Sequence, residues 1–318
     1  MITASQSSIL QASLARPVLI GPTFAGIAEL QVGQSLTHSP LSSHRELRRD
    51  LVARWRYKRH EFAYEWAWRH VTLLPGATER MLSEGGDSVK SAVKHRYLLA
   101  RLDDLLTPTS GFAVRFVQEL AGLGGDVKFL KHELDCNYNV PLPVKGVALN
   151  FLFKAGTHVP LFDSKSYITD RFFLGGATVF RAFANKVRGC HSRSVKQQLT
   201  PVTQGVGPRF RRDSYGGDVM YNASAYLSGP LPVPKSSIGE FRGHVFGHVG
   251  SLISINRKKG LKDHIETLVE QYRASVGVGV VLKTVFGARI ELNYSLPLKF
   301  SATDRVQSLQ LGIAFDFL

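Results

Sequence analysis

Hydrophobic and polar residues alternate with a period of two along most of this chain. The alternation is clearest in residues 60–69, 131–140, 218–227, 275–283 and 289–298, where one face is apolar or aromatic and the other carries charged, small or polar side chains. Successive side chains of a strand point to opposite faces, so this period predicts β-strands. The best helical candidate is 262–272, which we expect to form a short helix in a loop.

The alternating segments predict about fourteen strands, with turns rich in glycine and proline between them. Their expected bounds are 6–16, 23–36, 47–58, 60–71, 75–86, 89–103, 111–121, 126–140, 146–159, 217–229, 240–254, 273–285, 288–299 and 309–318. The alternation fails between about residues 160 and 216. A loop of that length inside a compact domain is usually functional.

The last segment, residues 309–318, reads LQLGIAFDFL. Its apolar side chains share one face, and Gln310, Gly312, Ala314 and Asp316 share the other. Such a strand at an open sheet edge in water invites aggregation, whereas it suits a barrel wall that touches lipid. Long strands with charge on one face favour an antiparallel transmembrane β-barrel. A large soluble β-sandwich is the alternative on pattern alone.

Composition is compatible with a membrane barrel. The 318 residues are 44% hydrophobic with a mean hydropathy of −0.05, and no run of 18 apolar residues occurs. Because only alternate residues of a barrel strand face lipid, ordinary average hydropathy does not exclude a membrane. The net charge of +15 would fit a basic lumen with basic loops, or nucleic-acid binding. The charges are scattered and no nucleic-acid motif accompanies them, so we expect no nucleic-acid partner.

The sequence offers little catalytic or metal-binding chemistry. It contains no P-loop, zinc cluster or nucleophile elbow, so a soluble enzyme lacks the residues it would need. His244 and His248 are four residues apart on a predicted strand, which separates them by roughly 13 Å, too far to share one metal ion. We therefore expect no enzymatic activity, no metal and no cofactor.

Several motifs resemble those of the BamA-like outer-membrane protein assembly family, also called the bacterial surface antigen family. The long loop reads FFLGGATVFRAF over 172–183, GVGPRF over 205–210 and YGGD over 215–218. In that family a glycine pair, here Gly175 and Gly176, precedes an Arg-Gly-Phe motif on a loop that folds back into the lumen. The ordered set of segments from about residue 40 to 318 most resembles the mitochondrial branch, the core barrel of the sorting and assembly machinery.

The C-terminal strand resembles the β-signal of the same family. That signal reads polar, any, Gly, any, any, hydrophobic, any, hydrophobic, and it matches Gln310, Gly312, Phe315 and Phe317. The resemblance implies that this strand forms one side of a lateral seam. There the glycine would keep the inward face thin, and the two phenylalanines would anchor the strand in lipid.

The chain departs from the family in two ways. Arg-Gly-Phe is here Arg181-Ala182-Phe183, which adds a methyl group at a closely packed position that can require an unusual backbone angle. Family members have sixteen strands preceded by at least one polypeptide-transport-associated domain. We expect residues 1–318 to be the barrel domain without its first two strands and without that N-terminal domain.

Arg181 is the residue expected to matter most inside the lumen, because a buried cation needs partners. Asp218 is the first choice as its partner, and Tyr226 and Glu291 are the other inward polar candidates. The family's bacterial members carry acids on the two strands after the loop, where this chain has Tyr226 and His248.

The resemblance implies insertion of β-barrel precursors into the mitochondrial outer membrane. Partners would be unfolded β-barrel precursors, accessory subunits of the assembly complex and membrane lipids. A precursor strand cannot leave its backbone groups unpaired in lipid, so a seam that offers a strand edge would pair them as the strand enters. A passive porin-like channel and a protein-translocation barrel of the plastid outer envelope are the alternatives. A lumen filled by the 160–216 loop argues against the open channel.

Overall fold

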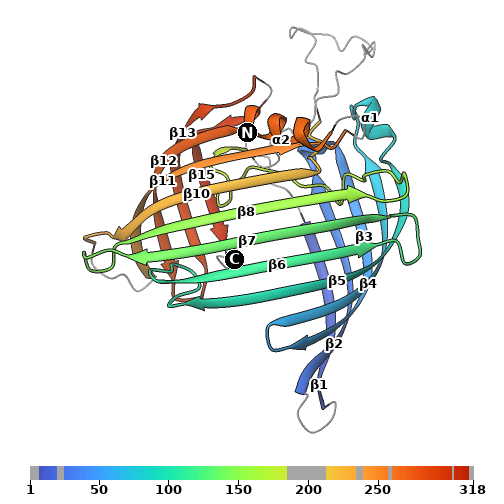
Figure 1. Cartoon of the computed structure of the whole chain (residues 1–318), viewed down its shortest axis with the longest axis horizontal. Helices are drawn as coiled ribbons and strands as arrows, with labels where there is room; N and C mark the ends of the chain where they lie inside the picture. The colour runs from blue at the N-terminus through green and yellow to red at the C-terminus, as the bar shows by residue number, and fades with distance from the viewer. Residues whose placement is uncertain are drawn as a thin grey trace.

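The computed structural model describes residues 7–19, 25–184, 213–233, 239–256, 260–302 and 304–314. One antiparallel sheet dominates it (Figure 1). The strands of this sheet are β1 (Ser7–Leu19), β2 (Ala25–Ser39), β3 (His44–Tyr57), β4 (His60–Leu73), β5 (Gly86–Leu102), β6 (Gly111–Ala121), β7 (Phe129–Pro141), β8 (Ala148–Pro160), β10 (Val219–Pro230), β11 (Gly239–Ile253), β12 (Arg273–Thr284), β13 (Arg289–Lys299) and β15 (Leu309–Ala314).

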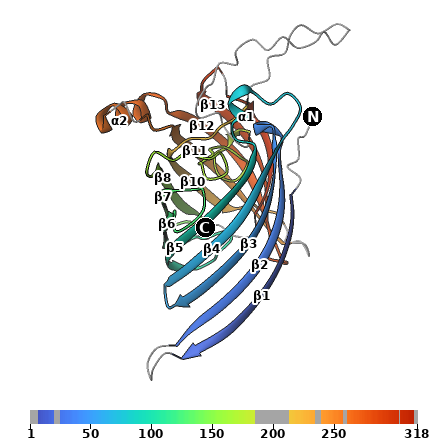
Figure 2. The same cartoon turned by 90° about the vertical axis from the view of Figure 1, so that its right-hand side faces the viewer.

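Each strand of the sheet pairs with the next one along the chain, and β8 pairs with β10 across the long loop. The 13 strands curl into a barrel wall, as Figure 2 shows from the side of β1. β1 and β15 are the two ends of the strand order, and no pairing joins them within the described residues. The expectation of an antiparallel β-barrel is confirmed.

The two faces of the wall differ as the alternation predicted. Apolar side chains such as Trp66, Val245 and Leu296 point outward and are exposed. Charged and amide side chains such as Glu65, Asn139 and Glu291 point inward and are buried. An apolar outside and a polar inside are the arrangement that a lipid-spanning barrel requires.

The predicted strand at 75–86 is wrong. This segment contains a short helix, α1 (Glu79–Leu82), and it connects β4 to β5. Met81 of α1 and Ala77, which lies just before the helix, pack with Ile168 and Tyr215 in a small buried cluster. The period of two therefore breaks here because tertiary packing selects a helical turn. The sheet has 13 strands rather than fourteen.

The helix expected at 262–272 is confirmed as α2 (Leu261–Glu270). A 3₁₀ turn, Pro40–Ser42, joins β2 to β3. Two very short strands, β9 (Ala182–Phe183) and β14 (Val306–Gln307), pair with each other outside the large sheet. No helix in the described part of the chain is long and apolar enough to cross a membrane.

The longest connections of the barrel lie at one end. The segments that contain α1 and α2 and the long loop after β8 all leave the wall at the same end. We call this the loop end, and we call the described residues 161–184 and 213–218 the lumen loop. The opposite end includes the two-residue turn between β3 and β4.

Candidate functional site: the lumen loop and the last strand

The lumen loop is fixed to the inner wall near its start by a buried ion pair. Arg69 of β4 donates from Nη1 to Asp170 Oδ1 (2.9 Å) and to Thr169 Oγ1 (2.8 Å). Lys90 of β5 lies 3.8 Å from the same carboxylate. Burial raises the pKa of Asp170, but the charges of Arg69 and Lys90 outweigh it and hold that pKa below its ordinary value. Asp170 is therefore an ionised anchor between the loop and two strands.

A second carboxylate, that of Asp213, fixes residues 213–218, the second part of the lumen loop. Asp213 accepts hydrogen bonds from Ser43 Oγ (2.5 Å) and from the backbone N–H (2.8 Å) and hydroxyl (2.9 Å) of Thr78. These partners belong to the connections before β3 and after β4. Asp213 is buried, so each of these bonds satisfies a group that water cannot reach.

The tip of the loop packs as a small hydrophobic core inside the barrel. Its buried members are Phe172, Leu174, Phe180, Ala182 and Phe183 of the loop with Leu252 of β11. Inward polar side chains satisfy the loop's carbonyl groups. Asn222 of β10 donates to the carbonyl of Val179 (2.9 Å), and Ser275 of β12 donates to that of Arg181 (2.9 Å). The loop is thus docked by both apolar packing and hydrogen bonds.

Arg181 at the loop tip is buried, with 1% of its surface exposed. Nη1 donates to the Tyr226 hydroxyl (2.9 Å) and lies 3.1 Å from His248 Nε2, and Nη2 forms an ion pair with Glu291 of β13. The guanidinium carbon also lies 5.0 Å from the centre of the Tyr226 ring. Arg289 approaches the other oxygen of Glu291 (2.7 Å). The structure therefore brings together Arg181 and two of its three predicted candidates.

The first-choice partner of Arg181, Asp218, lies elsewhere. Asp218 accepts from Ser166 Oγ (2.9 Å) and the backbone N–H of Ile255 (3.0 Å), and its carboxylate lies 3.5 Å from His158 Nδ1. It immediately precedes β10, whereas Tyr226 lies eight residues along the strand, closer to the loop tip. The hypothesis of an Arg181–Asp218 pair is therefore corrected. Asp218 leads directly into β10, which also carries Tyr226, so proximity in sequence to the loop did not identify how far along β10 the loop tip lies.

The loop backbone requires left-handed conformations at the motif. Gly175 and Gly176 have φ of 121° and 108°, values that side chains rarely permit. Ala182 has φ of 74°, so a residue with a Cβ occupies the position that is glycine in the family motif. A left-handed conformation costs a non-glycine residue about 1–2 kcal/mol. Packing and hydrogen bonds around the buried Ala182 therefore hold a strained backbone.

Gln310, the polar residue of the predicted β-signal, holds the loop tip by two hydrogen bonds. Its Oε1 accepts from the backbone N–H of Ala182 (2.9 Å), and its Nε2 donates to the carbonyl of Phe183 (2.8 Å). The adjacent backbone pairs with β14 through Val306 and Gln307. The four polar groups in these two hydrogen bonds are buried, and a buried polar group without a partner costs free energy.

Gly312 leaves room for the lumen loop to pack against the inner face of β15. A Cβ at this position would lie 2.8 Å from Thr178 Cγ2 and 3.0 Å from Ala177 Cβ. A real Cβ essentially never lies as close to another atom as it would to the Thr178 methyl group here, so only glycine fits without a shift of the neighbouring atoms. The polar and glycine positions of the signal both contact the lumen loop. The other two signal residues, Phe315 and Phe317, lie outside the described residues, as does the 205–210 motif.

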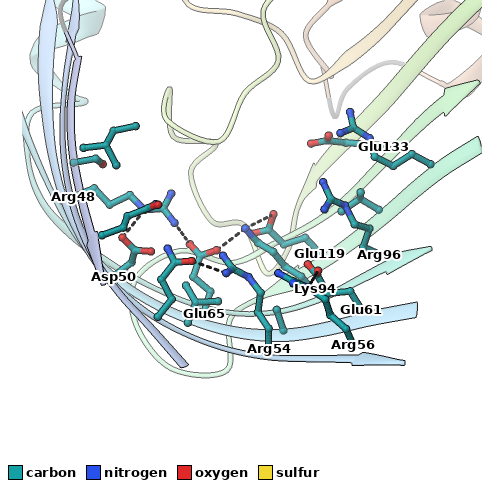
Figure 3. A pocket seen from close by; sticks show the side chains of 18 of the residues that line it. Arg48, Asp50, Arg54, Arg56, Glu61, Glu65, Lys94, Arg96, Glu119 and Glu133 are labelled. Atoms are coloured by element: carbon teal, nitrogen blue, oxygen red, sulfur yellow. Dashed lines mark hydrogen bonds and ion pairs between the residues drawn. The ribbon is translucent and has the colours of Figure 1, made fainter. Parts of the chain in front are cut away.

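A polar cavity of about 650 Å³ lies along the inner face of the first strands (Figure 3). Cross-strand ion pairs line it. Arg48 donates to Glu65 (2.5 Å), Lys94 Nζ lies 2.5 Å from the other Glu65 oxygen, and Arg56 pairs with Glu61 (2.8 Å). This part of the lumen is open and lined by side chains of both charges, whereas the tip of the loop covers the inner face of β10–β15.

Sequence reasoning missed several residues of the loop site. Asn222, Ser275 and Thr178 were not singled out, and His248 was noted without a role at Arg181. The inward parity of Asn222, His248 and Ser275 on their strands was a usable signal, since polar inward residues near a loop with buried carbonyls are its natural partners. Nothing in the pattern marked Thr178.

Comparison with known proteins places this chain in a family. The Omp85 superfamily domain matches residues 15–317. The chain belongs to the Omp85 superfamily. It is similar to the "Sorting and assembly machinery component 50 homolog" of Mus musculus, with 34% identity over 289 residues, covering 88% of this chain and 58% of that protein. The Homo sapiens protein of the same name is 33% identical over the same shares.

Two further relatives extend the comparison. The "Sorting assembly machinery 50 kDa subunit" of Saccharomyces cerevisiae is 27% identical over 311 residues, covering 91% of this chain and 58% of that protein. The crystal structure of BamA from Haemophilus ducreyi lacking POTRA domains 1–3 superposes with a TM-score of 0.75 at 14% identity, over 97% of this chain and 62% of that chain. This likeness shows the barrel fold. The chain spans a little over half the length of the curated relatives.

Proposed function

We propose that this chain is the barrel of the core subunit of the sorting and assembly machinery, and that it inserts β-barrel precursors into the mitochondrial outer membrane. The similarity to sorting and assembly machinery subunits over most of the chain supports this assignment. Its partners would be unfolded β-barrel precursors, accessory subunits and the surrounding lipid.

The contact between the lumen loop and the β-signal of β15 is the observation that carries the mechanism. β15 is an end of the strand order, and β13 is its neighbour in the sheet. A precursor strand with the same signal could replace β15 and make the same contacts. Its polar residue would meet the backbone of Ala182 and Phe183, and its glycine would lie under Thr178.

Backbone pairing explains why such an insertase would accept many clients. A client strand at a sheet edge gains hydrogen bonds from its own N–H and C=O groups, whatever its side chains are. In lipid those groups have no other partner, so pairing during entry removes the main barrier to insertion. The two hydrogen bonds between the loop backbone and the polar signal residue would then select for the signal, while the sheet edge provides general affinity.

The substitution Gln310→Ala tests this proposal. It leaves the buried N–H of Ala182 without a partner, at a cost of about 1–3 kcal/mol, and it removes one of the two hydrogen bonds to the carbonyl of Phe183, which also accepts from the N–H of Gly176 (3.1 Å). Full-length protein with this change should insert a radiolabelled porin precursor into mitochondrial membranes more slowly than wild type. Gln307→Ala is the matched control, because Gln307 is exposed. Normal insertion by Gln310→Ala would contradict the proposal, and a large steady conductance in planar bilayers would favour a passive channel.

A further inference from the structure

The outer face of β2, β3 and β4 contains one charged patch near the loop end. Leu51 of β3 and Trp66 of β4 point outward into the region that lipid covers, and both are exposed. Arg45 and Arg49 have the same parity on β3 as Leu51, so they also point outward, and both are exposed. Inward arginines on the same wall, such as Arg48, have carboxylate partners in the lumen, but these two do not face it.

Neighbouring side chains hold both outward guanidinium groups by one nitrogen only. Arg45 Nε donates to His38 Nδ1 (3.1 Å), and Arg49 Nε donates to Gln34 Oε1 (2.9 Å). The guanidinium carbon of Arg49 lies 5.4 Å from the centre of the Trp68 ring. Within the described parts of the chain, nothing is bonded to the terminal nitrogens of either arginine. Each therefore presents a free pair of N–H donors in a fixed orientation.

The position of the patch explains how charges are tolerated on a lipid-facing wall. A charged side chain at the centre of a bilayer is strongly unfavourable, and the penalty nearly vanishes at the interface. Trp68 faces Arg49 across the strands, and tryptophan is enriched at membrane interfaces. Arg45 lies next to the strand end. These residues therefore mark the depth at which lipid headgroups meet the barrel at the loop end.

We propose that Arg45 and Arg49 bind the phosphate groups of anionic phospholipids in the leaflet at the loop end. A guanidinium fork matches two phosphate oxygens, and basic residues near a membrane surface attract anionic lipids. The two arginines are four residues apart on a strand, roughly 13 Å, so they would contact neighbouring phosphates rather than one. The acid on this face, Asp87 of β5, contacts His70 (2.8 Å) and forms no hydrogen bond or ion pair with either arginine within the described residues.

A lipid is favoured over a free anion by the surroundings of the patch. Exposed apolar side chains border it on β2, namely Val32 and Leu36, and on β3 at Leu51. A ligand with acyl chains would cover these side chains while its phosphate met the arginines, whereas inorganic phosphate would gain nothing from them. This inference concerns the lipid contact of the barrel and does not depend on the insertion of client proteins.

The test is lipid retention by the full-length protein, measured by native mass spectrometry. The protein would be released from micelles that contain equal amounts of phosphatidylcholine and phosphatidylglycerol. We expect wild type to retain phosphatidylglycerol preferentially, and Arg45→Gln with Arg49→Gln to reduce that preference by about fivefold per arginine. Arg96→Gln is the control, because Arg96 lines the lumen cavity and should leave the preference unchanged. Arg45→Lys with Arg49→Lys should retain part of it, since charge remains but the fork is lost.

Three results would overturn the inference. One is an unchanged preference in the double glutamine variant, provided that far-ultraviolet circular dichroism shows a folded barrel. Another is displacement of the retained lipid by millimolar inorganic phosphate in wild type, which would indicate a site for free anions. A protein captured in place of lipid by a photoreactive residue at position 49 in whole membranes would likewise assign the patch to a partner subunit.

Discussion

At the residue scale, the loop tip combines a strained backbone with a buried charge. Ala182 keeps a φ of 74° where the family motif has glycine, and Arg181 keeps its charge at 1% exposure. Both are expensive in isolation. They persist because Gln310 holds the backbone on both sides of residue 182 and Glu291 supplies the counter-charge.

Replacing Ala182 by glycine should stabilise the protein. Glycine adopts a positive φ without the steric penalty, so we expect a gain of about 1 kcal/mol in the free energy of unfolding. Guanidinium unfolding of the refolded barrel in detergent would measure it. Ala177→Gly is the matched control, because Ala177 lacks a positive φ and the change should destabilise slightly. A destabilised Ala182→Gly would show that the methyl group contributes more by packing than it costs in strain.

Replacing Glu291 by glutamine should destabilise the protein strongly. The change removes the negative partner of Arg181 and of Arg289 while both cations stay buried, which typically costs about 3–5 kcal/mol. The same unfolding measurement applies. Glu240→Gln is the control, since Glu240 is about half exposed and its closest approach to Arg242 is 3.8 Å. Equal effects of the two changes would rule out Glu291 as the essential counter-charge.

At the element scale, β15 is held by the lumen loop as well as by β13. Its six described residues pair with β13, and two of them, Gln310 and Gly312, contact the loop. The presence of a polar residue and a glycine in this short strand thus has a physical reason. The polar residue satisfies loop backbone, and the glycine leaves room for the loop.

Gly312→Ala should weaken the contact between β15 and the loop. The added methyl group would meet Thr178 and Ala177 at distances that require a shift, and such overpacking costs about 1–3 kcal/mol. Increased cleavage of the loop by an added protease would report its release. Gly247→Ala is the matched control, because a Cβ there meets its nearest neighbour, Val276, at 4.0 Å. Identical protection of the two variants would refute the tight contact.

The strands themselves were largely predictable from the sequence, and their exceptions have physical reasons. Alternation identified the strands because each has one lipid-facing and one lumen-facing side. It failed at 75–86, where Ala77 and Met81 pack against Ile168 of the loop and favour a helical turn. The two-residue strands β9 and β14 are too short for any period to reveal.

At the scale of the whole molecule, the barrel has a covered side and an open side. The tip of the lumen loop lies against β10–β15, and the polar cavity lies along the inner face of the earlier strands. The site was only partly predictable. Arg181 followed from the resemblance to the family motif, and Tyr226 and Glu291 could be proposed from inward parity and the need to pair a buried cation. The choice between Asp218 and Tyr226 as the partner of Arg181 could not be predicted, because both residues have the same inward parity and only the depth of the loop tip decides between them.

The central claim is that a client strand takes the place of β15 against the lumen loop, and a compensation assay tests it most directly. A porin precursor with its signal glycine changed to alanine would be offered to protein that carries Ala177→Gly and Thr178→Ala, which opens the space above that glycine. We predict slow insertion by wild type and recovery by the double variant, with no recovery for a precursor that lacks the polar signal residue. Equal insertion of the glycine-to-alanine precursor by both proteins would contradict the account.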